Sequence, residues 1–269
     1  MTETVSIICV TYNEEKLIAR TIESFIRQET NGMQIEILII DGFSEDGTRD
    51  IVNSYTKKFP NIRLIDNPDR KNPYGRNIGL CEAKGNYIAL LGAHTIYESN
   101  YIRICIDEIK KTNSIGVSGK VITSFESDGS EAQLCELILT SPFGVSGKSF
   151  RTIEEGYTSM VNFPVYRRRV IDEIGFYDTA LLRNQDNDFN RRIIEKGFKL
   201  YCTWKTSCKY FPSDSLKQIF SYANRNGYWN AKSLSVAPKS MMMHHFIPLL
   251  FVTAVLLFAA DSVVGFFLG

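Results

Sequence analysis

The chain has 269 residues, with 31 lysines and arginines against 30 aspartates and glutamates, so its formal charge at neutral pH is +1. A near-neutral charge gives no support for a nucleic-acid partner. The contents of 44% hydrophobic and 23% charged residues argue against a disordered chain, and eight prolines with 18 glycines exclude a collagen-like or proline-rich filament.

Six cysteines are spread through the chain without a Cys-x-x-Cys pair, which argues against a zinc ribbon. Most of them lie inside apolar runs, as Cys9 does in VSIICV and Cys105 in YIRICI. We therefore expect small buried thiols in a reducing compartment. The N-terminus, MTETVSIICV, carries neither a basic segment nor a cleavage-site pattern, and no signal peptide is expected.

Short apolar runs alternate with helical patterns over about the first 90 residues. The apolar runs, typical of buried parallel strands, are VSIICV (5–10), IEILII (35–40), NIRLID (61–66) and YIALLG (87–92). The helical patterns lie near 17–26, 46–58 and 76–84. This order predicts an α/β domain whose parallel sheet is covered on both faces.

Polar residues follow three of these runs. Thr11, Tyr12, Asn13 and Glu14 come after the first run, Asp41, Gly42, Ser44 and Asp46 after the second, and His94 after the fourth. Because open α/β sheets bind ligands beyond the carboxyl ends of their strands, these clusters predict a binding site. Taken singly, the same residues are also ordinary turn residues and helix caps.

The second half of the chain is less regular. The loop SPFGVSGKSFR (141–151) either closes over a phosphate through its backbone N–H groups or serves as a flexible connection. The segment RNQDNDFNRRIIEKG (183–197) places Asp186 and Asp188 at the start of a helix, where an acid can also act simply as an N-cap. Asp188 is expected to orient Arg191.

Several familiar motifs are absent. No Gly-x-Gly-x-x-Gly follows the first strand, and neither a Gly-Lys-Ser/Thr phosphate loop nor a Gly-x-Ser-x-Gly elbow occurs. A dinucleotide dehydrogenase and a P-loop ATPase therefore lose support. The chain has three histidines, His94, His244 and His245. A Ser-His-Asp hydrolase would have to use His94 among them.

The end of the chain differs from the rest. The 24 residues from Phe246 to Gly269 carry one charge, Asp261, and exceed the roughly 20 needed to span a bilayer. The basic segment before them is typical of the cytoplasmic side of a membrane segment. A buried C-terminal helix fits less well, because no polar face recurs. A membrane hairpin and a re-entrant anchor both stay open.

Three segments, in this order, resemble glycosyltransferase family 2: VSIICVTYNEE, IIDGFSEDGT and GRNIGLCEAKGNYIALLGAH. SPFGVSGKSFR and RNQDNDFNRRI resemble the branch that includes succinoglycan-type exopolysaccharide glycosyltransferases. The resemblance, from about Val5 to Trp229, implies an α/β GT-A fold, a Rossmann-like nucleotide-diphosphosugar transferase domain. That domain is expected over 1–212, with a nucleotide-binding half (1–95) and an acceptor-binding half (96–212). An amphipathic interfacial segment (213–244) and a hydrophobic membrane segment (245–269) would follow.

The resemblance also implies an activity: inverting transfer of a sugar from a nucleotide-diphosphosugar, with UDP the expected carrier, to a hydroxyl of a lipid-linked or polysaccharide acceptor. Asp186 would be the general base, and Asp41 would accept a hydrogen bond from the base of the nucleotide. The expected nucleotide-binding residues are Thr11, Tyr12, Asn13, Glu14, Asp41, Ser44, Arg76 and Ala93. The residues expected on the acceptor or diphosphate side are Gln185, Asp188, Arg225 and Trp229. Asp188 would hold a second acceptor hydroxyl or only orient Arg191, and we favour the structural role. The protein would be membrane-associated, with its catalytic domain on the cytoplasmic side.

One position departs from the family pattern. Gly92-Ala93-His94 stands where this branch carries Asp-Ala-His. The resemblance implies a divalent cation, Mg²⁺ or Mn²⁺, with His94 as ligand, although imidazole is a poor partner for Mg²⁺. A weakly held cation, replacement by cationic side chains and loss of activity all stay open. Loss would leave a non-catalytic sugar-nucleotide-binding or scaffolding protein, and a nucleotidyltransferase on a related sheet is a further alternative.

The segment KQIFSYANRNGYWNAK (217–232) has two compatible interpretations. It resembles the family segment that closes over the diphosphate, with Arg225 and Trp229 as the candidates. It is also typical of an interfacial helix, with Tyr222, Tyr228 and Trp229 as aromatic anchors.

Overall fold

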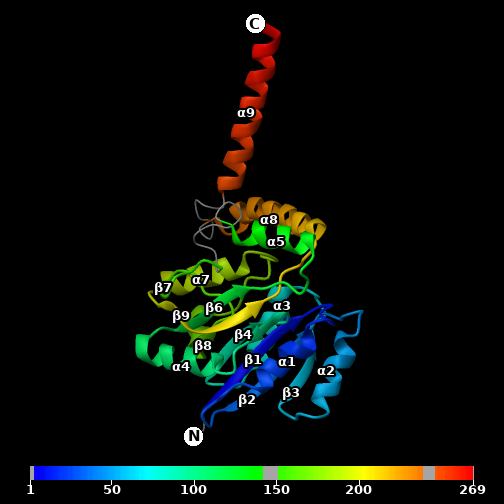
Figure 1. Cartoon of the computed structure of the whole chain (residues 1–269). Coiled ribbons are helices and arrows are strands. Elements are labelled where there is room, and N and C mark those ends of the chain that lie inside the picture. The colour runs from blue at the N-terminus through cyan, green and yellow to red at the C-terminus, as the bar shows by residue number, and fades with distance from the viewer. Residues whose placement is uncertain (1–2, 142–150, 239–245, 269) are drawn as a thin grey trace.

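The computed structural model describes residues 3–141, 151–238 and 246–268. Within these residues a nine-stranded sheet forms the centre, in the order β3-β2-β1-β4-β8-β6-β9-β5, with β7 paired to β9 (Figure 1). The strands are β1 (Thr4–Thr11), β2 (Gln34–Asp41), β3 (Ile62–Asp66), β4 (Tyr87–Gly92), β5 (Thr95–Tyr97), β6 (Gly116–Thr123), β7 (Gly156–Thr158), β8 (Val165–Arg167) and β9 (Leu200–Tyr210). The helices are α1 (Ile18–Ile26), α2 (Thr48–Thr56), α3 (Asn72–Glu82), α4 (Tyr101–Thr112), α5 (Ser130–Thr140), α6 (Arg169–Ile174), α7 (Gln185–Glu195), α8 (Leu216–Val236) and α9 (Ile247–Leu268).

Strands β1 to β4 run parallel, which confirms the predicted alternation of strands and helices. Successive side chains of a strand point to opposite faces. Ile7 therefore belongs to a core cluster with Phe25 of α1, while Ile8 belongs to a second cluster with Leu80 of α3. Both faces of the sheet are buried under helices, as the continuous apolar runs predicted.

The carboxyl ends of these strands meet at one edge of the sheet. Thr11 and Asp41, the last residues of β1 and β2, are paired, and Asp41 is paired in turn with Asp66 of β3. Val10 is paired with Gly92 at the end of β4. The polar segments that follow these strands are therefore brought together, as a ligand site at this edge requires.

The second half of the chain extends the same sheet. β8 lies antiparallel between β4 and β6, an arrangement that the sequence did not predict. β9 runs parallel to β6, with a register shift between Gly119 and Lys120. The sheet thus continues across the division expected between residues 95 and 96.

Helices α3 and α7 position two of the predicted site residues. α3 begins at Asn72, before the predicted 76, because Pro73 suits the first turn of a helix. It packs closely on β1, since a Cβ at Gly75 would lie only 2.8 Å from Val10, and this contact fixes Arg76. α7 begins at Gln185 and carries Asp186 in its first turn, as predicted.

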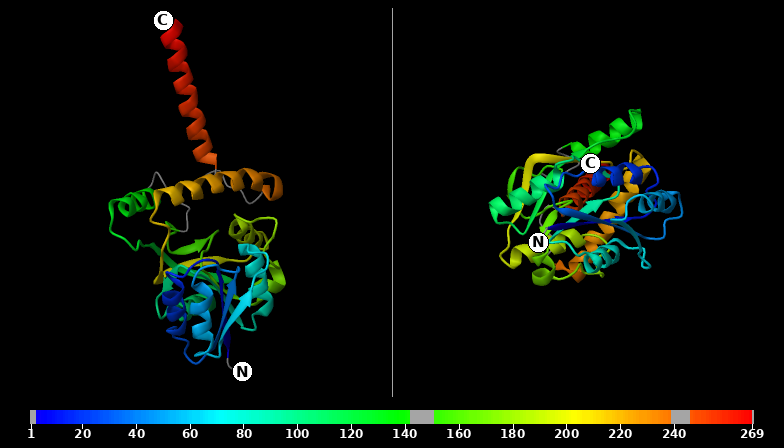
Figure 2. Two further views of the ribbon diagram at one scale, coloured as in Figure 1. Left: turned by 90° about the vertical axis from the view of Figure 1, so that its right-hand side faces the viewer. Right: turned by 90° about the horizontal axis from the view of Figure 1, so that it is seen from below.

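Helices α5 and α8 pack against each other over one end of the sheet, and α9 extends away from them (Figures 1 and 2). Within the described ranges, no helix has both the length and the apolar character needed to cross a bilayer. The membrane segment predicted at 245–269 is therefore not confirmed and stays a prediction. Residues 142–150 of the predicted phosphate loop lie outside the described residues.

Candidate functional site

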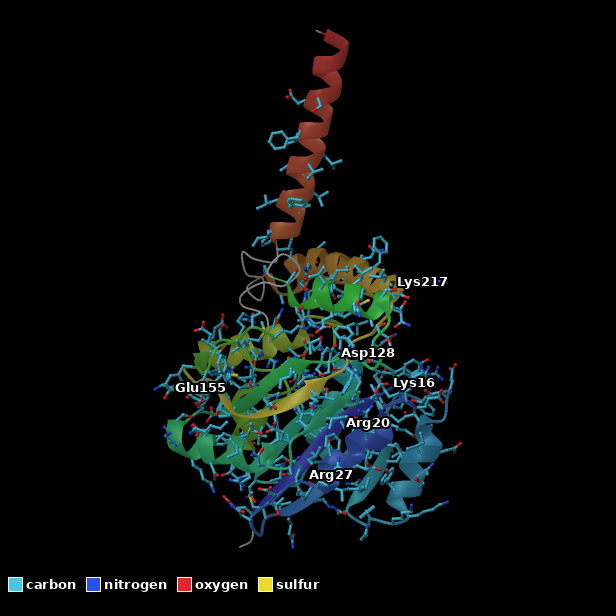
Figure 3. The ribbon with its side chains drawn as sticks, viewed as in Figure 1. Lys16, Arg20, Arg27, Asp128, Glu155 and Lys217 are labelled. Atoms are coloured by element: carbon cyan, nitrogen blue, oxygen red, sulfur yellow. The ribbon has the colours of Figure 1, made fainter. Side chains whose placement is uncertain are left out.

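A cavity of about 900 Å³ lies between the loops that follow β1 and β4 and the layer of α5 and α8. In Figure 3, Lys16 and Arg20 are seen below Asp128 and Lys217. Asp128 lies just before α5, and Lys217 lies at the start of α8. The predicted residues in the cavity wall are Tyr12, Asn13, Glu14, His94 and Arg225. Further polar or aromatic wall residues, not assigned from the sequence, are Lys16, Arg151, Arg183, Tyr210 and Tyr222.

The loops after β1 and β2 are locked together by Asn13 and Ser44. Asn13 has a left-handed backbone (φ 54°), a conformation that asparagine tolerates better than most residues. Its N–H donates to the Ser44 hydroxyl over 2.9 Å, and its side-chain oxygen accepts from the Glu45 N–H over 2.8 Å. Two residues predicted from separate segments thus form one rigid rim.

Asp41 is fully buried behind this rim. Its carboxylate accepts hydrogen bonds from the Ser44 N–H (3.0 Å) and from the Arg49 guanidinium (2.7 Å). Arg49 also donates to Asp66 over 2.8 Å, and the hydrogen bonds to Asp41 and Asp66 raise the pKa of Arg49. Asp41 does not belong to the cavity wall described above, and its contact with a nucleotide base stays a prediction.

Thr11 and Ala93 also lie behind the cavity wall. Thr11 is buried, and its hydroxyl oxygen has no hydrogen-bond partner among the described residues. The carbonyl of Ala93 accepts a hydrogen bond from the Thr21 hydroxyl over 2.8 Å, which ties the end of β4 to α1. Neither residue belongs to the cavity wall described above.

His94 is paired with Glu14 in the cavity wall. Its Nδ1 lies 2.8 Å from Oε1 of Glu14, and its ring centroid lies 5.2 Å from that of Tyr210. An ionised carboxylate only accepts hydrogen bonds, so with Glu14 ionised the hydrogen of this contact is carried by Nδ1. One ring nitrogen, Nε2, is left for any other ligand.

The place of the missing carboxylate is occupied by an aromatic ring. A Cβ at Gly92 would lie 2.8 Å from the Phe163 ring and 3.0 Å from the Thr95 hydroxyl oxygen. In the described part of the chain, no group of three or more histidine, cysteine or carboxylate side chains is placed to hold a metal ion. Mg²⁺ demands oxygen ligands in near-octahedral geometry, and one imidazole nitrogen does not meet that demand. The predicted role of His94 therefore stays untested, and the surrounding residues fit a cation poorly.

Asp186 lies at the start of α7 and is ion-paired with Arg76 of α3. Arg76 also donates to the Tyr177 hydroxyl over 3.0 Å, and its guanidinium lies 4.9 Å from the Tyr177 ring centroid. Burial alone would lower the pKa of Arg76, but Asp186 and Tyr177 outweigh this effect and raise it. The Asp186 side chain is 33% exposed, so its carboxylate remains accessible.

The other residues predicted on the acceptor side are distributed around α7 and α8. Gln185 is largely buried, and its amide oxygen has no hydrogen-bond partner in residues that the structure describes. Asp188 accepts hydrogen bonds from Arg191 and Arg192, each over 2.8 Å, as a positioning role requires. Trp229 is half-buried beneath the Lys232 ammonium, and the cavity wall given above does not include it.

The structure thus brings the predicted residues together in two groups. Glu14 and His94 meet in the cavity wall, while Arg76 and Asp186 meet each other at the junction of α3 and α7.

Two arginines of the wall, Arg151 and Arg183, are the main residues that sequence reasoning missed. Arg151 and Arg183 lie at the ends of segments singled out above, but nothing in their spacing showed that they face one cavity. The guanidinium of Arg151 lies 5.4 Å from the ring centroid of Tyr210, and that of Arg183 lies 4.7 Å from Tyr222. Burial, and then the neighbouring Tyr222, raise the pKa of Tyr210 to about 12, so its phenol stays neutral at physiological pH.

Comparison with known proteins gives relatives over most of the chain. Residues 6–175 match the sequence model of Glycosyl transferase family 2. A relative from Methanococcus voltae, named dolichyl N-acetyl-alpha-D-glucosaminyl phosphate 3-beta-D-2,3-diacetamido-2,3-dideoxy-beta-D-glucuronosyltransferase, is 34% identical over 84% of this chain and 75% of its own. Succinoglycan biosynthesis protein ExoA of Rhizobium meliloti is 26% identical over 82% of this chain and 67% of its own.

Solved structures of other proteins have a similar arrangement of helices and strands. The crystal structure of S. aureus TarS 1–349 in complex with UDP matches with a TM-score of 0.59 and 17% identity, over 87% of this chain and 66% of that one. A likeness at this identity concerns the fold alone. The chain spans about two thirds to three quarters of the length of these three proteins.

Proposed function

The chain belongs to glycosyl transferase family 2 and has a GT-A fold, and on this premise we propose that it is an inverting glycosyltransferase with a UDP-sugar donor. The observation that carries the proposal is the cavity at the carboxyl ends of the parallel strands. Its wall combines Tyr12 and Asn13, from the loop after β1, with Arg183 and Arg225, from before α7 and from α8. An aromatic rim suits a nucleoside, and guanidinium groups suit a diphosphate.

In this proposal Asp186 is the general base. Its carboxylate takes the proton of the acceptor hydroxyl while that oxygen bonds to the anomeric carbon. The bond from this carbon to the diphosphate breaks, and its electron pair leaves with UDP. Arg76 orients the carboxylate through their ion pair, and the start of α7 favours a negative charge there. General-base catalysis of this kind contributes about 10²–10⁴-fold in rate.

The acceptor is proposed to be a lipid-linked saccharide at the cytoplasmic face of a membrane. The relative from Methanococcus voltae is named for a dolichyl-linked sugar phosphate. Exposed apolar side chains on α5 and α8, such as Leu137 (62% exposed) and Phe220 (76% exposed), support a membrane nearby. Lys217 and Lys232 of α8 would favour anionic headgroups.

An Asp186→Asn variant tests the assignment of the base. We expect UDP release from the accepted UDP-sugar, in the presence of a lipid-linked acceptor, to fall by about 10²–10⁴-fold. UDP binding measured by calorimetry should be unchanged, because the substitution keeps the shape of the side chain. Asp172→Asn on the exposed side of α6 is the matched control and should keep full turnover. Full turnover in Asp186→Asn would remove this residue as the base.

A second candidate, a non-catalytic sugar-nucleotide-binding protein, is favoured by one observation. A Cβ at Gly92, the position where the related branch carries aspartate, would lie 2.8 Å from the Phe163 ring, so a carboxylate there would require the ring to move. Incubation of the full chain with a panel of UDP-sugars separates the two candidates. Slow UDP release supports the transferase, and tight binding with no release of UDP supports the binder.

A further inference from the structure

The carboxylates that line the cavity are already engaged within the protein. Each of the five acidic residues of the described wall has a hydrogen-bond or ion-pair partner; they are Glu14, Glu15, Asp46, Glu126 and Asp214. Glu14 faces His94, and Glu126 is ion-paired with Arg20 of α1. Each of these acids is therefore held in place by a partner other than Arg183 or Arg225.

Two arginines of the wall, Arg183 and Arg225, have no carboxylate partner among the described residues. Within the described residues, neither Arg183 nor Arg225 has a carboxylate within 4.0 Å. Arg183 donates instead to the neutral side-chain oxygen of Asn226 over 2.5 Å and stacks on the Tyr222 ring at 4.7 Å. A guanidinium held by neutral groups keeps its full charge, and its remaining N–H donors are available to an anion.

Among the residues that the structure describes, no group of three or more histidine, cysteine or carboxylate side chains is placed to hold a cation in this cavity. The ring of Phe163 occupies the space beside Gly92, and His94 has one nitrogen committed to Glu14. The usual arrangement, in which a carboxylate-bound cation neutralises the diphosphate, therefore lacks its ligands among the described residues.

From these observations, and resting on the proposed function, we infer that Arg183 and Arg225 hold the donor diphosphate and neutralise its leaving-group charge without a divalent cation held by the protein. Arginine is permanently protonated and forms paired hydrogen bonds with phosphate oxygens. The bond from the anomeric carbon to the diphosphate breaks, and its electron pair goes to the terminal phosphate oxygen. Guanidinium groups that are held in the wall before the donor binds can stabilise this charge without reorganising, which lowers the barrier.

The two arginines come from different elements, and this separates their roles. Arg183 precedes α7, the helix that carries Asp186, whereas Arg225 lies on α8. Arg183 thus links the diphosphate to the helix of the proposed base. Arg225 links it to the layer that covers the cavity.

The test is UDP binding by the full chain, measured by calorimetry in EDTA and again with Mn²⁺ or Mg²⁺, with uridine as the ligand that lacks the diphosphate. We expect UDP to bind in EDTA with an affinity within about threefold of that with a cation, and more tightly than uridine. Arg183→Gln and Arg225→Gln should each weaken UDP binding by about 10- to 100-fold and leave uridine binding unchanged. Arg63→Gln, which removes an arginine paired with Glu82 outside the cavity, should change neither. Circular dichroism confirms that each variant is folded.

The possible results separate this inference from the proposed function. UDP binding that requires Mn²⁺ or Mg²⁺ and disappears in EDTA overturns the inference but leaves a nucleotide-sugar transferase intact. Arginine variants that bind UDP as tightly as the unmodified chain also overturn it. Absence of UDP binding under every condition overturns both.

Discussion

The two walls of the cavity are built in different ways. The rim after β1 and β2 consists of residues close together in short segments, and Asn13, Ser44 and Asp41 fix one another by hydrogen bonds. The opposite wall takes Arg151, Arg183 and Arg225 from three segments far apart in the chain. The first wall is held by its own polar network, whereas the second depends on how α5, α7 and α8 pack. In the proposed function, the first wall therefore fixes the shape of the nucleoside site, and the second supplies charge to the diphosphate.

Breaking the polar network of the first wall should give the largest loss of stability. Arg49→Leu leaves the fully buried Asp41 without its cationic partner. We expect the free energy of unfolding to fall by about 3 kcal/mol, the low end of the usual range, because Ser44 still donates to Asp41. Urea denaturation measures the change. Arg63→Leu, which breaks an exposed pair with Glu82, should lose at most about 1 kcal/mol.

Equal losses in Arg49→Leu and Arg63→Leu would contradict the claim that the first wall is held by a buried network.

Gly92→Asp tests whether the missing carboxylate can be restored. Because the new Cβ would lie 2.8 Å from the Phe163 ring, we expect a loss of about 1–3 kcal/mol in unfolding free energy. Gly129→Asp is the matched control, since its Cβ would have no neighbour within 4 Å, and it should be nearly neutral. A Gly92→Asp variant that keeps full stability and gains Mn²⁺ binding would show that the site accepts a cation.

The second wall should respond more mildly to loss of its aromatic support. Tyr222→Leu removes the ring on which Arg183 rests. Because an exposed cation–π contact is worth about 0.5–1 kcal/mol, we expect UDP binding to weaken about two- to fivefold. Tyr222→Phe keeps the ring and should bind UDP as the unmodified chain does. If both variants behave alike, the ring does not position Arg183.

The sequence predicted the first wall better than the second, for a physical reason. Periodicity and turn residues are local signals, so the strands, the polar strand ends and the place of Asp186 in the first turn of α7 could be predicted. The packing of Phe163 beside Gly92 and the convergence of Arg183 and Arg225 depend on contacts between distant segments. The antiparallel insertion of β8 was missed for the same reason, because its three residues carry no periodic signal.

The position of Asp186 shows the same limit. Its place in the first turn of α7 followed from the local pattern, but its ion pair with Arg76 joins residues 110 positions apart. A motif can therefore predict a candidate base without predicting the group that orients it.

The most direct test of the account is a structure of the full chain with UDP bound in the presence of EDTA. The account predicts the diphosphate between Arg183 and Arg225, the uracil against the rim of Tyr12 and Asn13, and an open path from the terminal phosphate to Asp186. A nucleotide bound outside this cavity, or a diphosphate with neither arginine in contact, would contradict it.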